Sequence, residues 1–110
     1  MNKKQSSELD GNAVVARAAK KAAKSLGISS EQISLILGSD SDQSTYTERA
    51  LKLIQLYQAL SGLIGANTDH MRAWMASNNF ALRARPLDLI IQYGGLDHAL
   101  AYLYTHLNSP

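Results

Sequence analysis

The spacing of the apolar residues is the feature that most constrains the fold of this chain. Five segments carry apolar side chains three and four positions apart, and no segment of strand length alternates apolar with polar residues. A spacing of three and four follows the turn of an α-helix, whereas a half-buried strand needs a spacing of two. The sequence therefore predicts an all-α protein, a compact bundle of about six helices. The 110 residues are enough for one domain.

Residues 1–44 are predicted to form a polar tail and two helices. The first helix, over 12–26, has an apolar stripe from Val15 through Ala18 to Leu26 and ends at Gly27. Its opposite side carries four basic residues, which are Arg17, Lys20, Lys21 and Lys24. These cations are candidates for contacts with DNA phosphates, although a solvated lysine face is the interpretation that we favour.

The second helix is predicted to begin at a capping box formed by Ser29 and Gln32 and to run to Leu37. Two helices joined by a short turn are typical of the start of a helix-turn-helix. However, the next stretch, GSDSDQS, is acidic and turn-forming, so a recognition helix does not follow. We therefore interpret the N-terminal part as a shortened helix-turn-helix-like unit.

Residues 45–110 are predicted to hold the other helices and to pack with the first part as one compact unit. The longest helix spans 45–64 and begins at a second capping box, Thr45 with Glu48. A short helix starts near Asp69 and carries Met71, Trp74 and Met75.

The final third of the chain is predicted to form two more helices. Pro86 suits the first position of a helix, which is expected to end at Gly94 and Gly95. The last helix has apolar residues at helical spacing from Leu96 to Leu107.

The sequence offers no constellation of catalytic or metal-binding residues. There is no cysteine, and His70, His98 and His106 lack the spacing of metal ligands. Asp40 and Asp42 lie in a polar stretch and are interpreted as turn residues. Neither a nucleotide-binding glycine loop nor a nucleophile motif is present. We therefore predict no enzyme activity, no cofactor and no metal.

The chain is also predicted to lie in the cytoplasm. No apolar run approaches the about 20 residues that a membrane helix needs, and the polar start does not have the pattern of a signal peptide. The lack of cysteine suits a reducing compartment. The formal net charge of only +2 means that the composition by itself does not indicate nucleic-acid binding.

From about residue 46 to 107 the order of features resembles the toxin-binding domain of the Xre/MbcA/ParS antitoxin family. The matching segments are ERALKLIQLYQALSGLIG, the Trp of MRAWMASNN, RARPLDLI and GGLDHALAYL. Trp74, Asn79 and Leu82 are similar to the family's Trp, Asn and Leu, and Asn78 stands where the family usually has Pro.

The resemblance implies an antitoxin of a type II toxin–antitoxin system. Its partner would be a RES-domain toxin, which depletes NAD, and the antitoxin would occlude the toxin's active site without catalysis of its own. A homodimer and a toxin–antitoxin hetero-oligomer are implied as well. The alternatives are an Xre-like DNA-binding repressor and an orphan protein-interaction domain.

The concentration of family-like residues and of tyrosines near the C-terminus points to 86–107 and the tail as the toxin-facing element. The helix over 45–64 is expected to be the scaffold and the dimer element, or only core. The residues expected to bind toxin are Arg83, Arg85, Pro86, Tyr93, Gly95, Leu96, Tyr102, His106, Asn108, Ser109 and Pro110.

Overall fold

The described part of the chain folds as six α-helices, as the apolar spacing predicts. The computed structural model describes the backbone of residues 3–38 and 43–108, with side chains from residue 13 onward. Apart from an isolated bridge between Asn79 and Ala84, these residues form no β-structure. The helices are α1 (Lys3–Ser25), α2 (Ser30–Leu37), α3 (Gln43–Ile64), α4 (Thr68–Ala76), α5 (Pro86–Leu89) and α6 (Gly95–Leu107).

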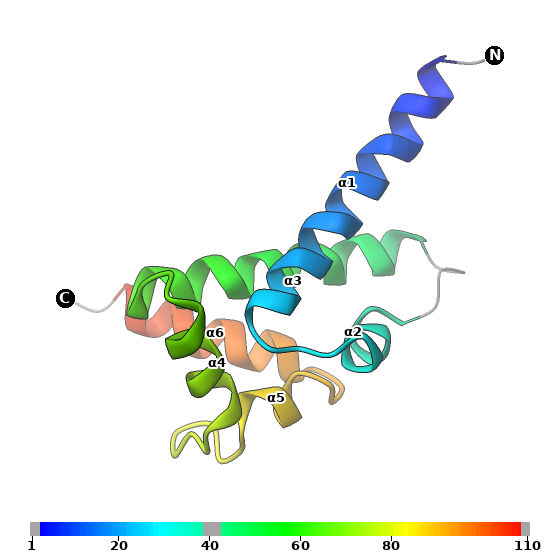
Figure 1. Cartoon of the computed structure of the whole chain (residues 1–110). Helices are drawn as coiled ribbons and strands as arrows, with labels where there is room; N and C mark the ends of the chain where they lie inside the picture. Colours follow the sequence, from blue (N-terminus) through cyan, green and yellow to red (C-terminus); the bar gives the residue numbers. More distant parts are fainter. Residues whose placement is uncertain (1–2, 39–42, 109–110) are drawn as a thin grey trace.

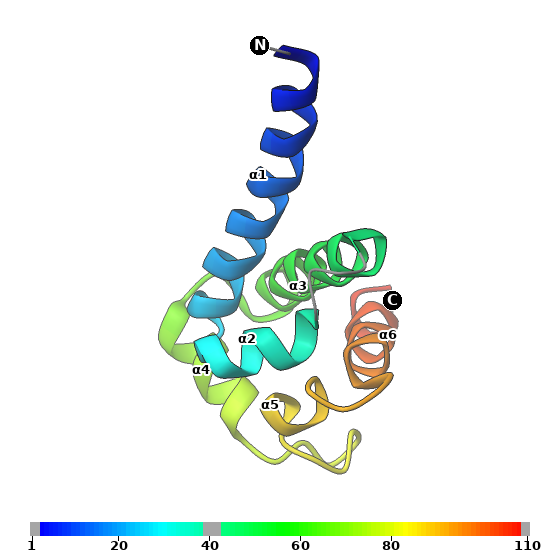
Figure 2. The ribbon, with the colours of Figure 1, turned by 90° about the vertical axis from the view of Figure 1, so that its right-hand side faces the viewer.

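Helix α3 is the centre of the bundle. It packs against α1, α2, α4 and α6, with α1 crossing it and α6 lying alongside (Figures 1 and 2). Leu53, Leu56 and Leu60 of α3 are completely buried in the shared core. Because four helices cover α3, the structure supports its expected role as scaffold.

Helix α1 is longer than predicted. Its backbone is helical from Lys3 rather than from residue 12, so the predicted start of this helix was wrong. The outer part leads away from the bundle (Figure 1). Ala19, Ala23 and Leu26 are buried and anchor the inner part. Once a helix is anchored, each added residue gains a hydrogen bond without repeating the cost of nucleation.

The apolar stripe predicted for α1 is narrower in the structure. Ala18 is exposed, although it was expected to face the core. The chain leaves the helix at Gly27, whose φ of +80° is a left-handed conformation that glycine adopts without strain.

One predicted capping box is confirmed and the other is wrong. The Ser29 hydroxyl accepts from the Gln32 N–H at 3.1 Å, and the Ser29 N–H donates to Gln32 Oε1 at 2.8 Å. Helix α3, however, begins at Gln43, so Thr45 lies inside its first turn and is not the N-cap. The N-cap of α4 is Asn67, whose side chain accepts from the His70 N–H at 3.0 Å.

Helix α5 is a single turn and ends at Leu89, well before the predicted Gly94. Pro86 does open it, as expected. Beyond Leu89 the chain reverses through hydrogen-bonded turns, and Gly94 has a φ of +75°. Gly95 then packs so closely on α5 that an added Cβ would lie 1.7 Å from the Leu89 carbonyl oxygen. Leu89, the last residue of α5, and Gly95, the first residue of α6, are therefore in close backbone contact.

None of the described helices combines the length and the hydropathy that a membrane span requires.

Candidate protein-binding site

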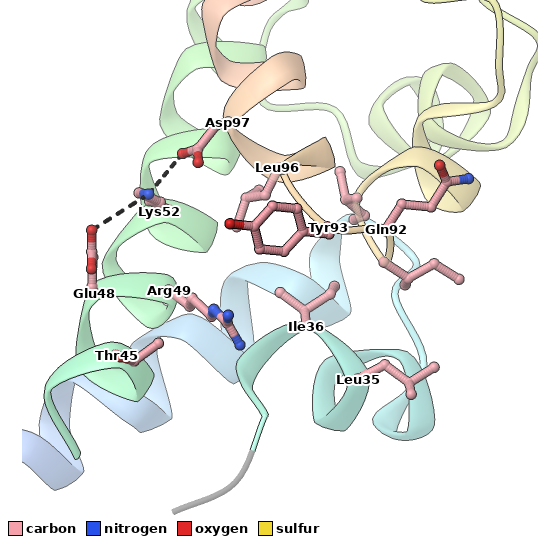
Figure 3. A pocket seen from close by; sticks show the side chains of 13 residues that line it. Leu35, Ile36, Thr45, Glu48, Arg49, Lys52, Gln92, Tyr93, Leu96 and Asp97 are labelled. Atoms are coloured by element: carbon pink, nitrogen blue, oxygen red, sulfur yellow. Dashed lines mark ion pairs between the residues drawn. The ribbon is translucent and has the colours of Figure 1, made fainter. Parts of the chain in front are cut away.

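A pocket of about 450 Å³ lies between α2, the N-terminal half of α3 and the turn that precedes α6 (Figure 3). We call it the Tyr93 pocket. Ile36 of α2 and Leu96 of α6 supply apolar wall, and Arg49 and Lys52 of α3 supply charge. The pocket therefore combines apolar surface with a few charged groups, as ligand and partner sites do.

Tyr93 stands at the pocket with its side chain fully exposed. The turn that carries it is fixed on both sides. The Gln92 N–H donates to the Leu89 carbonyl at 3.0 Å, and the Gly95 N–H donates to the Gln92 carbonyl at 2.9 Å. A large aromatic ring held on such a turn buries area against a partner with little ordering cost.

An ion network joins α3 to α6 beside the pocket. Lys52 Nζ lies 2.7 Å from Asp97 Oδ1 and 3.6 Å from Glu48 Oε1. The hydrogen bond that Lys52 donates to Asp97 and the charges of both carboxylates raise the pKa of Lys52, against the opposing effect of desolvation. Both carboxylates of the pocket are thus already paired with one lysine.

Arg49 is the other cation of the Tyr93 pocket. Its side chain is half-buried and lies over Gly38, where an added Cβ would be 3.0 Å from Nη1. Within the described part of the chain it forms no ion pair. Because a guanidinium is always charged and binds carboxylates with two parallel donors, Arg49 is suited to an acidic group from a partner.

The predicted toxin-binding residues do not gather in one place. Tyr93 and Leu96 belong to the Tyr93 pocket. Pro86, Gly95 and Leu96 are buried in the free protein, so they shape the surface more than they present side chains to a partner.

The two predicted arginines differ in their surroundings. Arg85 is exposed and holds Asp88 with two bonds, Nε to Oδ2 at 2.9 Å and Nη2 to Oδ1 at 3.0 Å. The hydrogen bond and charge of Arg85 lower the pKa of Asp88, and the same pairing raises the pKa of Arg85. Arg83 is exposed on the preceding loop, with a left-handed φ of 59°.

The remaining predicted toxin contacts lie along α6. Tyr102 is half-buried, and its ring centroid lies 4.3 Å from that of the exposed His106. Asn108 is exposed at the end of the helix, and Ser109 and Pro110 lie outside the described residues, as do Asp40 and Asp42.

The basic face of α1 is exposed as predicted. Arg17, Lys20, Lys21 and Lys24 are all on the surface, and none of them forms an ion pair with another described residue. The C-terminal end of this helix is held by Arg72, whose Nη2 donates to the Lys24 carbonyl at 2.9 Å.

Sequence reasoning missed one prominent residue, Phe80. It lies on the loop between α4 and α5, which the sequence indicated only as irregular, and its side chain is 99% exposed. A single aromatic residue among small and polar neighbours was the available signal. The contributions of Arg49 and Lys52 were also missed, because the fold brings them to Tyr93 from a distant part of the chain.

Within the described residues, no group of three His, Asp or Glu side chains is placed to hold a metal ion. The same residues contain no buried polar or charged side chain. The chain matches no protein-family model, and no curated protein matches it.

Proposed function

We propose that this chain is a non-catalytic antitoxin that binds a RES-domain toxin and covers the toxin's active site. The observation that carries the proposal is Tyr93, a fully exposed ring on a fixed turn beside a pocket. Such rings are typical anchors of protein interfaces. The class of partner rests on the resemblance of residues 46–107 to the Xre/MbcA/ParS family.

Occlusion of an active site needs buried area and a few anchors, not shifted pKa values. Tyr93 supplies the aromatic anchor, and Arg49 supplies a cation for a carboxylate of the toxin. The Lys52 bridge between α3 and α6 holds both sides of the pocket together before binding. A surface that is ordered in advance loses less entropy when a partner docks.

The proposal is tested by purifying the tagged chain from its host and identifying bound proteins by mass spectrometry. We expect a RES-domain protein in stable proportion, and restored NAD levels in cells that carry both proteins. Recovery of the chain without any such protein contradicts the proposal. A cytoplasmic location belongs to the same proposal, because the toxin would consume the NAD of the cell there.

The contact surface is tested by Tyr93→Ser, with Phe80→Ser as the matched control, because Phe80 is an equally exposed ring outside the Tyr93 pocket. Loss of a central aromatic anchor costs about 2 kcal/mol or more, which weakens binding roughly 30-fold. Phe80→Ser should leave the affinity within a few-fold of wild type. Equal effects of the two changes would show that the Tyr93 pocket is not the toxin contact.

The basic face of α1 favours a second candidate function, repression through DNA binding. Four exposed cations on one helix match an electrostatic contact with phosphates. A gel shift on the chain's own promoter tests it, because about four phosphate contacts give a slope near −4 in log affinity against log salt. An affinity that does not change with salt concentration, or no binding at all, argues against this function.

A further inference from the structure

Leu35 of α2 is a large apolar residue that the core of the protein does not use. The helix buries Ile33, Ile36 and Leu37, whereas the side chain of Leu35 is 65% exposed. Leu35 nevertheless lines the Tyr93 pocket. A partner that covered it would gain free energy, because an apolar side chain is stabilised roughly in proportion to the area that it removes from water.

Three exposed apolar side chains from two separate segments line the Tyr93 pocket. Leu35 comes from α2, and Ile91 and Tyr93 come from the turn that precedes α6. All three are exposed, and Tyr93 is completely so. A single exposed apolar residue needs no explanation, but several that border one hollow are typical of a protein interface. The fold therefore joins α2 and this turn into one apolar rim.

Arg49 places a cation among these apolar side chains. Figure 3 shows its side chain extending from α3 toward Ile36 of α2. The guanidinium takes up the space over Gly38, which has a φ of +78° and no side chain that would fill this space. No described carboxylate forms an ion pair with Arg49, so its donors remain available to an incoming group.

The other charged groups of the pocket are already matched to one another. Lys52 holds both Glu48 and Asp97. Figure 3 shows these three side chains together on the side of Arg49 that faces away from α2. An arriving carboxylate gains the guanidinium of Arg49, whereas an arriving cation must compete with Lys52 for the carboxylates. The charges of the pocket therefore favour an acidic group.

We propose that the Tyr93 pocket receives an acidic residue with an apolar residue on either side, and that α2 takes part in this contact through Leu35. The carboxylate pairs with Arg49, and the flanking side chains pack on Leu35 and on Tyr93 with Ile91. The inference rests on the proposed function, because the acidic segment belongs to the toxin. Helix α2, which the sequence predicts as part of a shortened helix-turn-helix-like unit, then serves protein binding.

The apolar and the charged parts of this contact depend on each other. An ion pair in water contributes little, because solvent screens it. Apolar flanks exclude water from Arg49, and a guanidinium–carboxylate pair is stronger in a drier surrounding. Arg49 is also half-buried in the free protein, so part of the cost of its desolvation is met before the partner arrives.

A first experiment uses a synthetic probe and needs no toxin. The isotope-labelled full chain is titrated by NMR with the capped tripeptide leucine–glutamate–leucine. We expect weak binding, with the shifts concentrated at Leu35, Arg49 and Tyr93. Two matched peptides test the two parts of the contact. Leucine–glutamine–leucine lacks the charge and serine–glutamate–serine lacks the apolar flanks, and each should bind at least several-fold more weakly.

A second experiment measures toxin binding by variants of the full chain. Leu35→Ser should weaken binding about tenfold, because a large apolar contact is lost. Leu51→Ser is its control, since Leu51 is an exposed leucine of α3 outside the pocket.

The charged part of the contact is tested in the same assay. Arg49→Gln should weaken toxin binding about tenfold, because a hydrogen-bonded charge is lost. Arg17→Gln is its control, since it removes the same charge from the surface of α1. Both controls should bind like wild type. Thermal unfolding of Leu35→Ser should stay close to wild type, because Leu35 lies outside the core.

The two experiments separate failure of this inference from failure of the proposed function. Toxin that binds Leu35→Ser and Arg49→Gln as tightly as the two controls leaves the antitoxin proposal standing and overturns the contact. A chain that captures no toxin overturns the toxin as the source of the segment, and the tripeptides then decide whether the pocket takes an acidic and apolar segment at all. Equal binding of the glutamate and glutamine peptides, or no shift at the pocket, overturns that assignment as well.

Discussion

Replacing Gly95 by Ala tests whether the reversal between α5 and α6 is as tight as the structure shows. The new Cβ would lie 1.7 Å from the Leu89 carbonyl oxygen and 2.7 Å from its carbon. An ordinary contact needs about 3.5 Å, so α5 and α6 must separate by roughly 2 Å. Overpacking in a core costs about 1–3 kcal/mol, and a backbone neighbour cannot swing aside. The better helix propensity of alanine offsets about 1 kcal/mol of this overpacking cost.

Because the closest contact is with backbone, we take the upper end of this balance and expect Gly95→Ala to lower the free energy of unfolding by about 2 kcal/mol, and the melting temperature by roughly 8–16 °C. Urea and thermal denaturation measure both. The matched control is Gly62→Ala within α3, where the added Cβ meets only the end of the Leu107 side chain at 3.2 Å. That change should stay within about 1 kcal/mol of wild type. Equal stability of the two variants would refute the close approach of Gly95 to Leu89.

Three further changes probe the turns and caps. Arg83 has a φ of 59°, in the left-handed region. This conformation costs residues other than glycine about 1–2 kcal/mol. Arg83→Gly removes part of this cost and should therefore raise the melting temperature. Arg72→Met removes the donor to the Lys24 carbonyl and should lower stability in urea by about 1 kcal/mol. Arg85 lowers the pKa of Asp88. The stabilisation from this pair is therefore present above the ordinary carboxyl pKa of about 3.9 and is lost as pH falls through the lowered value. In Arg85→Gln the pKa of Asp88 should return toward its ordinary range, and an NMR titration of Asp88 measures this change.

The helices with a wide buried face could be predicted from the sequence. In α3 and α6 the leucines at helical spacing are the buried ones, including Leu53, Leu60 and Leu103. The Ser29 cap was also predictable, because both of its hydrogen bonds join residues three positions apart. These features depend on local spacing, which a sequence displays directly.

The features that the sequence did not predict depend on contacts between residues that are distant in the chain. The apolar pattern after Pro86 extends past Leu89, but the helix ends there and the Leu89 carbonyl meets the Gln92 N–H of a turn and the backbone of Gly95. The Tyr93 pocket likewise needs Arg49 from α3, which no spacing rule connects to Tyr93. The sequence singled out Tyr93 as a candidate surface residue, whereas the charged side of the pocket is formed only by the fold.

The packing of the core does not explain the two exposed aromatic rings, Tyr93 and Phe80. Tyr93 and Phe80 bury almost nothing, so neither contributes to the core, and an exposed ring adds to the risk of aggregation. Each sits on a hydrogen-bonded turn beside its own hollow, and the two hollows share no residue. Under the proposed function, a partner that covers the Tyr93 pocket leaves Phe80 exposed, because the two rings belong to separate surfaces.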